Sequence, residues 1–262
     1  MKRLIMLAAL PALLLAGCAA QPAASGTETL TVTGSYPLQY AQQFTIDECE
    51  GGYYLITIDG TRYLVVPEGE NAPAELDADI TVLQQPIENI YLVSSSAMDP
   101  IISIDGLDTV ALSGTQADNW YLDAAKTAME NGQIAYAGKY SAPDYETILA
   151  ANCGLAIENT MIYHTPEVKE QLEKFGVPVL VERSSYESGP LARMEWVKLY
   201  GVLLGKTDEA EQVFDDAVQR IAPLENESAT GKTVAFFSIT SNNLATVRKG
   251  GDYVAKMIEM AG

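Results

Sequence analysis

Short apolar runs that suit β-strands alternate with helix-like patterns from residue 86 onward, and this alternation constrains the fold more than any other feature of the chain. Strands that alternate with helices at this spacing are typical of a mostly parallel sheet covered by helices on both faces. We therefore predict an α/β lobe over residues 86–189. Strands are predicted over 89–93, 109–112, 134–137, 155–158 and 177–181, and helices over 97–104, 120–129, 144–151 and 165–176.

Two helices and a short final segment are predicted after this lobe. Residues 190–224 hold two amphipathic or apolar helix patterns separated at Gly205, a residue that commonly ends helices. A strand over 233–239 and a helix over 252–260 follow, with a loop between them. Because one strand and one helix cannot bury a core, we interpret residues 231–262 as the start of a second α/β lobe and the chain as truncated within it.

The residues before the α/β lobe divide into a tether and a β-rich segment. Residues 18–35 are rich in Ala, Ser, Thr and Gly and predict a tether that buries nothing. Residues 36–85 predict a small β-rich preface, in which glycine-containing turns that suit hairpins separate the strand-like runs 44–46, 53–58 and 62–66.

Residues 1–17 have the features of a secretory signal. Lys2 and Arg3 precede an apolar stretch over 4–15, which is too short for a membrane-spanning helix of about 20 residues. The segment ends in Leu-Ala-Gly-Cys, which resembles the lipobox of bacterial lipoproteins and implies that Cys18 is acylated and becomes the first mature residue. A plain secretory signal is the alternative. Lipid chains on Cys18 would hold the protein at the outer side of a membrane, at the cell surface or in the periplasm.

The charge of the chain excludes one class of partner. The formal net charge is −19, and removal of residues 1–17 leaves 14 basic against 35 acidic residues, a formal charge of −21. Such a surface repels nucleic acids and anionic lipid headgroups. We therefore expect no nucleic-acid partner.

Two cysteines remain besides Cys18. Exported proteins can join such a pair in a disulfide, but Cys153 directly precedes an apolar run and suits a small buried residue. We therefore favour free thiols at Cys49 and Cys153.

Polar and basic side chains follow the predicted strands. In open parallel sheets, ligands bind beyond the carboxyl ends of the strands. Because basic residues are scarce in this chain, their presence at these ends predicts a site for an anionic ligand; ordinary polar loops are the alternative. The candidate ligand-binding residues are Ser95, Ser96, Lys139, Tyr140, Arg183, Tyr186, Arg248 and Lys249.

The sequence lacks the patterns of common catalytic centres. His164 is the only histidine and directly precedes a predicted helix, where an exposed residue without a chemical role is favoured. We predict no metal centre, since the usual His and Cys ligands are missing. No Gly-x-Ser-x-Gly elbow and no phosphate-binding Gly-x-x-x-x-Gly-Lys-Ser/Thr loop occurs. We assign no catalytic residue, although 35 acidic residues leave a hydrolase with a carboxylate pair open as an alternative.

Four segments between residues 87 and 262 carry a family resemblance, namely 141–149 with 154–157, 172–179, 203–211 and 247–253. The first two resemble the Asn-Leu-Glu-x-Ile-Leu…Pro-Asp-Leu-Val-Ile and Leu-x-x-Leu-Gly-Ile-Pro-Val signatures of class III periplasmic binding proteins. These proteins serve ABC importers of iron–siderophore chelates, haem and cobalamin. The other two segments resemble the start of the family's long lobe-bridging helix and of its second lobe.

The resemblance implies a fold and a function. The fold is α/β, with two lobes joined by a long helix, a β-rich preface and a second lobe that lacks roughly 100 residues. The function is that of a monomeric, non-enzymatic component that captures an iron–siderophore-like chelate, haem or cobalamin and delivers it to an ABC permease and its ATPase. No resident cofactor is implied, and iron would enter only within a chelate. Glu146 matches the glutamate with which the family's first lobe docks on the permease; a solvated surface residue is the alternative.

The sequence also departs from the family and leaves other functions open. Asn152, Cys153 and Gly154 stand where the family's Pro-Asp-Leu element has its proline. An extracellular hydrolase and a structural or adhesive surface lipoprotein remain alternatives. Turnover with a titrating group would favour the hydrolase, and neighbouring permease and ATPase genes would favour transport.

Overall fold

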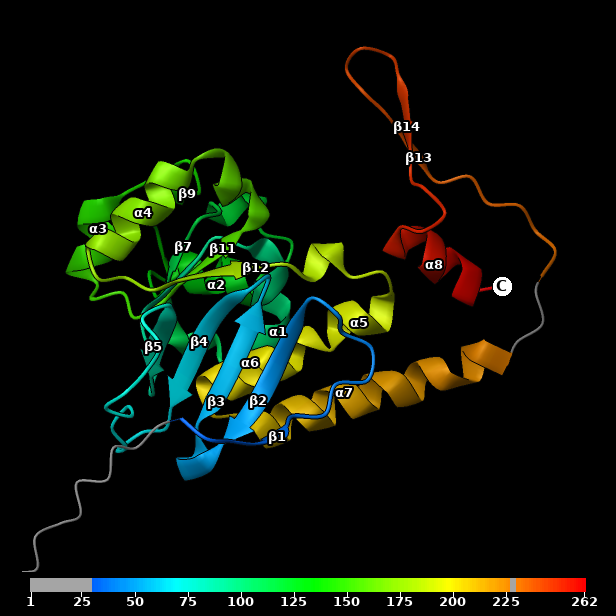
Figure 1. The fold of residues 1–262 in the computed structure, drawn as a ribbon. Helices are drawn as coiled ribbons and strands as arrows, with labels where there is room; N and C mark the ends of the chain where they lie inside the picture. Colours follow the sequence, from blue (N-terminus) through cyan, green and yellow to red (C-terminus); the bar gives the residue numbers. More distant parts are fainter. Residues whose placement is uncertain (1–29, 227–229) are drawn as a thin grey trace, which may run out of the picture.

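The computed structural model describes residues 30–226 and 230–262, so the predicted signal, Cys18 and most of the predicted tether lie outside the described residues. Two five-stranded sheets and their helices form the main body, and a C-terminal segment stands beside it (Figure 1). Across residues 30–226 and 230–262, no helix combines the length and the apolar character that crossing a membrane requires.

The predicted α/β lobe contains a five-stranded parallel sheet. Its strand order is β12-β11-β6-β7-β8, and every neighbouring pair is parallel. The predicted strands lie within two residues of the observed ones, because the apolar Val, Ile and Leu runs are buried on both faces of the sheet. The strands are β6 (Ile90–Leu92), β7 (Val110–Ser113), β8 (Ala135–Tyr136), β11 (Ala156–Asn159) and β12 (Val179–Glu182).

Helices cover both faces of this sheet, as predicted. The helices α1 (Met98–Ser103) and α2 (Asp123–Glu130) contribute to the apolar cluster on one face. The helices α3 (Tyr145–Ala150) and α4 (Pro166–Lys174) bury Ile148, Val168 and Leu172 on the other. Thr165 is the N-cap residue of α4, but its Oγ1 atom is buried without a hydrogen-bond partner.

The N-terminal sheet is larger than predicted. Its strands are paired in sequence order, antiparallel from β1 to β4 and parallel between β4 and β5. The predicted tether over 18–35 is corrected, since its last four residues form β1 and pair with β2. Strand β5 was not predicted, because its pairing with β4 spans the acidic loop 67–79 and is not a hairpin. The strands are β1 (Val32–Ser35), β2 (Phe44–Cys49), β3 (Tyr54–Ile58), β4 (Thr61–Val66) and β5 (Ile80–Gln84).

The two sheets share one apolar core. Phe44, Ile56 and Tyr63 of the N-terminal sheet belong to the same buried cluster as Ile90 and Leu180 of the parallel sheet. The N-terminal sheet is therefore part of the body of the protein. We refer to both sheets, together with helices α1 to α4, α5 (Pro190–Met194) and α6 (Trp196–Leu204), as the first lobe.

The predicted helix over 190–204 is two helices, α5 (Pro190–Met194) and α6 (Trp196–Leu204), and α7 (Thr207–Ile221) follows. Glu195 between α5 and α6 keeps helical dihedral angles, but the Lys198 N–H bonds to the Glu195 carbonyl only three residues back, at 3.0 Å. Almost all of α6 is buried. It packs closely against α7, since a Cβ atom on Gly201 would lie 2.5 Å from that of Ala210.

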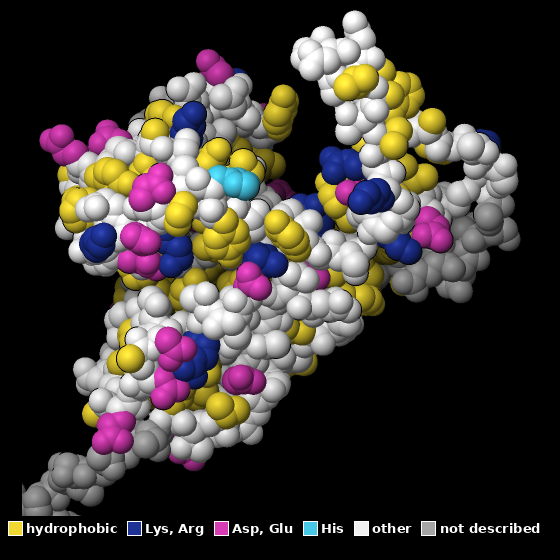
Figure 2. Space-filling view, turned by 45° about the horizontal axis from the view of Figure 1, so that its top comes forward, with side chains coloured by type: hydrophobic (Ala, Val, Ile, Leu, Met, Phe, Trp, Pro, Cys, Tyr) yellow, Lys and Arg dark blue, Asp and Glu magenta, His cyan; other side chains and the backbone are white. Residues whose placement is uncertain are grey.

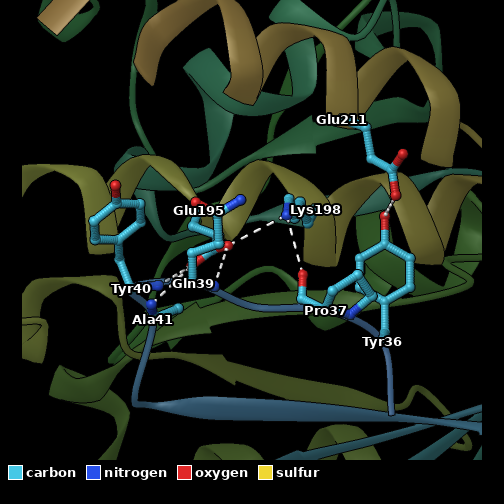
Figure 3. Close-up of polar contacts among 8 residues, drawn as sticks. All are labelled: Tyr36, Pro37, Gln39, Tyr40, Ala41, Glu195, Lys198 and Glu211. Atoms are coloured by element: carbon cyan, nitrogen blue, oxygen red, sulfur yellow. Dashed lines mark hydrogen bonds and ion pairs between the residues drawn. The ribbon is translucent and has the colours of Figure 1, made fainter. Parts of the chain in front are cut away.

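Glu195 connects these helices to the loop before β2. Its carboxylate accepts hydrogen bonds of 2.7–2.8 Å from three successive backbone N–H groups, those of Gln39, Tyr40 and Ala41 (Figure 3). The buried Lys198 lies 3.3 Å from the same carboxylate and donates to the Pro37 carbonyl at 3.0 Å. A second buried carboxylate, that of Glu187, accepts from the N–H groups of Gln42 and Gln43 and from Trp196 Nε1. The two carboxylates thus fix the N-terminal sheet to the base of the predicted lobe-bridging helices.

The C-terminal segment is an exposed hairpin followed by a helix. β13 (Phe237–Ile239) pairs with β14 (Ala245–Val247) in antiparallel fashion, and α8 (Tyr253–Met260) follows. The strand predicted over 233–239 is shorter, and β14 lies in the stretch predicted as a loop. Residues 231–250 are exposed throughout. The segment contacts the first lobe through α5 and α8, where the Arg193 guanidinium lies 4.0 Å from the centre of the Tyr253 ring.

Both described cysteines are free and buried. Cys49 lies in the small cluster on the outer face of the N-terminal sheet, and Cys153 lies in the cluster beneath α3 and α4. Burial raises the pKa of each thiol. Because the two residues occupy different clusters, no disulfide joins them.

Candidate functional site

The carboxyl ends of the five parallel strands meet at one edge of the sheet, and the strand order creates a switch point there. β7 follows β6 on one side, whereas the chain later returns through β11 on the other side. Such a switch point opens a crevice outside the carboxyl ends of the strands. Two loops flank this point: the loop that starts at Val93 after β6 and the loop that starts at Thr160 after β11.

The serines after β6 are bound to a carboxylate that the sequence analysis did not single out. Glu182 is 2% exposed and accepts hydrogen bonds from Ser94 Oγ (2.9 Å), Ser96 Oγ (2.8 Å) and the Ser184 N–H (2.7 Å). This network holds the loop after β6 against the loop after β12. Ser96 is therefore engaged within the protein, whereas Ser95 is exposed. The sequence signal that could have indicated this site was a glutamate at the end of the strand-like run Val-Leu-Val-Glu.

Lys139 and Tyr140 lie on a small hairpin after β8, formed by β9 (Gly138–Lys139) and β10 (Ala142–Pro143). The hairpin requires glycine at position 138, where φ is +83° and a Cβ atom would lie 2.3 Å from the Ala142 carbonyl oxygen. Tyr140 packs against the cluster beneath α3 and α4. Lys139 is exposed and forms no ion pair with any residue that the structure describes.

Arg183 and Tyr186 follow β12 and contact each other. The Arg183 guanidinium lies 4.6 Å from the centre of the Tyr186 ring, and its Nη1 lies 2.8 Å from Asp59 Oδ2 in the turn between β3 and β4. The Arg183 side chain is 15% exposed, whereas Tyr186 is largely exposed. The predicted cation is therefore present at the sheet edge, but it already has an aspartate partner.

Arg248 and Lys249 lie in the C-terminal segment. Together with Phe236, Ser238 and Asp252 they line a hollow of about 830 Å³. Arg248 Nη1 lies 3.2 Å from Asp252 Oδ2, and Lys249 is exposed. In Figure 2 basic side chains gather where the C-terminal segment meets the first lobe, and an open gap separates the upper part of this segment from the first lobe. The described hydrogen bonds, ion pairs and ring contacts do not join Arg248 or Lys249 to Lys139 or Arg183.

Glu146 and His164 are both exposed. Glu146 lies in the first turn of α3, which Asp144 caps by accepting from the Thr147 N–H. His164 ends the short helical turn Thr160–His164 before α4. Within the described ranges, no three His, Cys, Asp or Glu side chains gather as metal ligands do.

Glu158 is a second buried carboxyl that the sequence analysis missed. It lies on β11 opposite Val181 of β12 and is fully buried, and neither carboxyl oxygen has a hydrogen-bond partner. Burial raises its pKa from 4.5 to about 8, so the carboxyl is protonated at neutral pH. A glutamate beside Leu, Ala and Ile in a strand-like run was the signal that could have indicated it.

Comparison with known proteins places this geometry in a known fold. No family model matches the chain. An uncharacterised lipoprotein of Methanocaldococcus jannaschii is 22% identical over 217 residues, which are 78% of this chain and 52% of that protein. The structure of the periplasmic haem-binding protein HutB of Vibrio cholerae matches with a TM-score of 0.54 and 17% identity, over 67% of this chain and 64% of that one. Holo-ViuP matches with a TM-score of 0.51 and 14% identity, over 66% and 57%.

These similarities establish the fold. The chain has the α/β fold of the class III periplasmic binding proteins, as the sequence resemblance predicted. It spans about half the length of the curated relative and less than two thirds of the two solved chains.

Proposed function

We propose that this protein is the extracytoplasmic substrate-binding component of an ABC importer and that it captures an iron–siderophore-like chelate, or haem or cobalamin. The observation that carries the proposal is the carboxyl edge of the parallel sheet. In a fold shared with binding proteins, Lys139 and Tyr140 follow β8 at one side of the sheet. Arg183 and Tyr186 follow β12 at the other side, so the switch point between β6 and β11 lies between the two pairs. Arg248 and Lys249 of the C-terminal segment supply further cations to the opposing side.

Delivery and anchoring complete the proposal. Glu146 is exposed on α3, away from the core clusters, and would meet a cation of the permease. Acylated Cys18 would hold the protein at the membrane, where two or more acyl chains give stable attachment. The similarity to a protein named a lipoprotein supports an extracytoplasmic location.

A fluorescence titration tests the proposal. Trp120 follows the loop after β7 and donates from Nε1 to Ser113 Oγ at 3.3 Å, so it lies next to the candidate edge. Trp196 lies in the core and donates to Glu187, which makes it an internal reference. The titration uses the full-length gene product, because residues 1–262 span only part of the length of the relatives. Ferric enterobactin, haemin and cyanocobalamin are the probes.

We expect saturable quenching by at least one probe and the loss of most of this signal in Trp120→Phe, with binding retained by direct calorimetry. Arg183→Ala should weaken binding of an anionic probe. Absence of saturable binding for all three probes would contradict the proposed function.

A further inference from the structure

The Arg183 side chain bridges two parts of the first lobe. Arg183 directly follows β12 at the carboxyl edge of the parallel sheet, and its Nη1 donates to Asp59 Oδ2 at 2.8 Å. Asp59 belongs to the N-terminal sheet, in the turn between β3 and β4. The turn of the N-terminal sheet therefore reaches the edge at which the parallel sheet would bind its ligand.

The position of Asp59 is set by its turn. Asp59 and Gly60 are the two residues between paired Ile58 and Thr61, and both have positive φ, +49° and +80°. Such dihedral angles are those of a two-residue hairpin turn, which Asp, Asn and Gly accommodate. Because both strands are anchored in the shared core through residues such as Ile58 and Tyr63, the backbone of the turn is held where the Asp59 carboxylate can reach Arg183.

Only some of the N–H groups of the Arg183 guanidinium have an acceptor within the described residues. A guanidinium can bind a carboxylate through two parallel N–H groups, but among the described residues Arg183 donates to a single oxygen of Asp59. Its Nε atom is buried without a hydrogen-bond partner, and one face of the group lies over the Tyr186 ring. Asp59 itself is about half exposed and accepts no other side-chain hydrogen bond within the described residues. Because Asp59 is half exposed and accepts through one oxygen only, solvent screens its attraction to Arg183, so another anion can compete with it.

We propose that Asp59 is an internal competitor for Arg183 and sets the charge selectivity of the site: an anionic group of the ligand displaces Asp59, and a ligand without net charge does not. The proposal rests on the proposed function and names a specificity-determining residue for it. The Tyr186 ring orients the Arg183 guanidinium. An anionic group of the ligand can therefore take the place of the Asp59 carboxylate while the guanidinium keeps its orientation.

The test compares two variants that each remove one aspartate from an ion pair of the N-terminal sheet. Asp59→Asn keeps a residue that tolerates positive φ. The matched control is Asp79→Asn, because Asp79 is likewise an exposed partner of an arginine, Arg62, but has no contact with Arg183. Affinities of the full-length gene product are measured for ferric enterobactin, which is anionic, and for cyanocobalamin, which has no net charge, at low and high sodium chloride.

We expect Asp59→Asn to bind the anionic probe about two- to fivefold more tightly than wild type at low salt, with Asp79→Asn unchanged. The gain should disappear at high salt and in the double variant Asp59→Asn, Arg183→Ala, because it requires the released guanidinium. Binding of the uncharged probe, if present, should not change. Equal affinity of Asp59→Asn and wild type for the anionic probe, or an equal gain in Asp79→Asn, would overturn the proposal.

A ligand-free measurement separates this proposal from the proposed function. Phenylglyoxal modifies accessible arginines, and mass spectrometry of the peptide that contains Arg183 gives its rate. We expect a several-fold faster modification of Arg183 in Asp59→Asn and no change in Asp79→Asn. If wild type binds no probe, the proposed function fails, and an unchanged modification rate in Asp59→Asn then also shows that Asp59 does not restrain Arg183.

Discussion

Replacing Glu158 with methionine should stabilise the protein, and the gain should grow as the pH rises. The side chain is fully buried in β11, both carboxyl oxygens lack partners, and burial raises its pKa from 4.5 to about 8. Between these two values the unfolded chain ionises Glu158 whereas the folded chain keeps it protonated. Unfolding then releases a proton, so the free energy of unfolding falls as the pH rises through this window.

The magnitude follows from the linkage relation. Each pH unit within the window lowers the free energy of unfolding by about 1.4 kcal/mol, so wild type should lose about 3 kcal/mol between pH 5 and pH 7 through this residue. Well below pH 4.5 the contribution is constant, because the carboxyl is protonated in both the folded and the unfolded state. Methionine has a similar length, does not titrate and leaves no polar atom unpaired, which adds a gain that does not depend on pH.

Urea unfolding followed by tryptophan fluorescence and circular dichroism, repeated from pH 5 to pH 8, measures this effect. Glu158→Gln is the matched control, because it removes the titration but retains a buried polar amide. Both variants should lack the pH-dependent loss, and only Glu158→Met should also gain stability at pH 5. Parallel pH dependences of wild type and both variants would refute the assignment of a protonated buried carboxyl.

Further predictions concern the Glu195 carboxylate, the lipid anchor, the proposed docking residue and the C-terminal segment. Glu195→Ala should lower the free energy of unfolding by about 3–5 kcal/mol, because three N–H groups and the buried Lys198 lose their acceptor. Lys198→Met should lower it by less, and an equal or larger shift of the urea midpoint in Lys198→Met would contradict this. Cys18→Ala should move the protein from the detergent phase to the aqueous phase in partitioning assays, and unchanged partitioning would exclude the lipid anchor. Glu146→Arg should impair uptake in cells without changing ligand affinity, so a tenfold weaker affinity would place Glu146 in the binding site. Limited proteolysis should cut within 231–250 before the first lobe, since these residues are exposed and bury no apolar face; a resistant hairpin would contradict this.

Local patterns predicted most of the parallel sheet and its helices. The strand at 177–181 and the helix at 165–176, for example, lie where the structure has β12 and α4. Both depend on contiguous residues, an apolar run or an apolar stripe with a proline at the start, and each buries a face that any surrounding α/β fold would cover. Strands β5 and β14 were missed, because their pairing partners, not their own composition, make them strands.

The same distinction between local and long-range features applies to the residues of the candidate site. Strand order within a sheet is not encoded in any one segment, but the carboxyl ends of parallel strands always share an edge, so Lys139, Arg183 and Tyr186 could be assigned to that edge from the sequence. The partners of these residues could not, since Asp59 lies 124 positions from Arg183 and Glu182 lies 86 positions from Ser96. By itself, then, the sequence determined the alternation of strands and helices, the strongly acidic character and the residue types at the strand ends, because these are local or summed properties. Only the tertiary structure decided that Arg183 is already paired, that Glu158 is buried as a neutral acid and that the N-terminal sheet shares the core, because charge pairing and burial depend on which distant segments pack together.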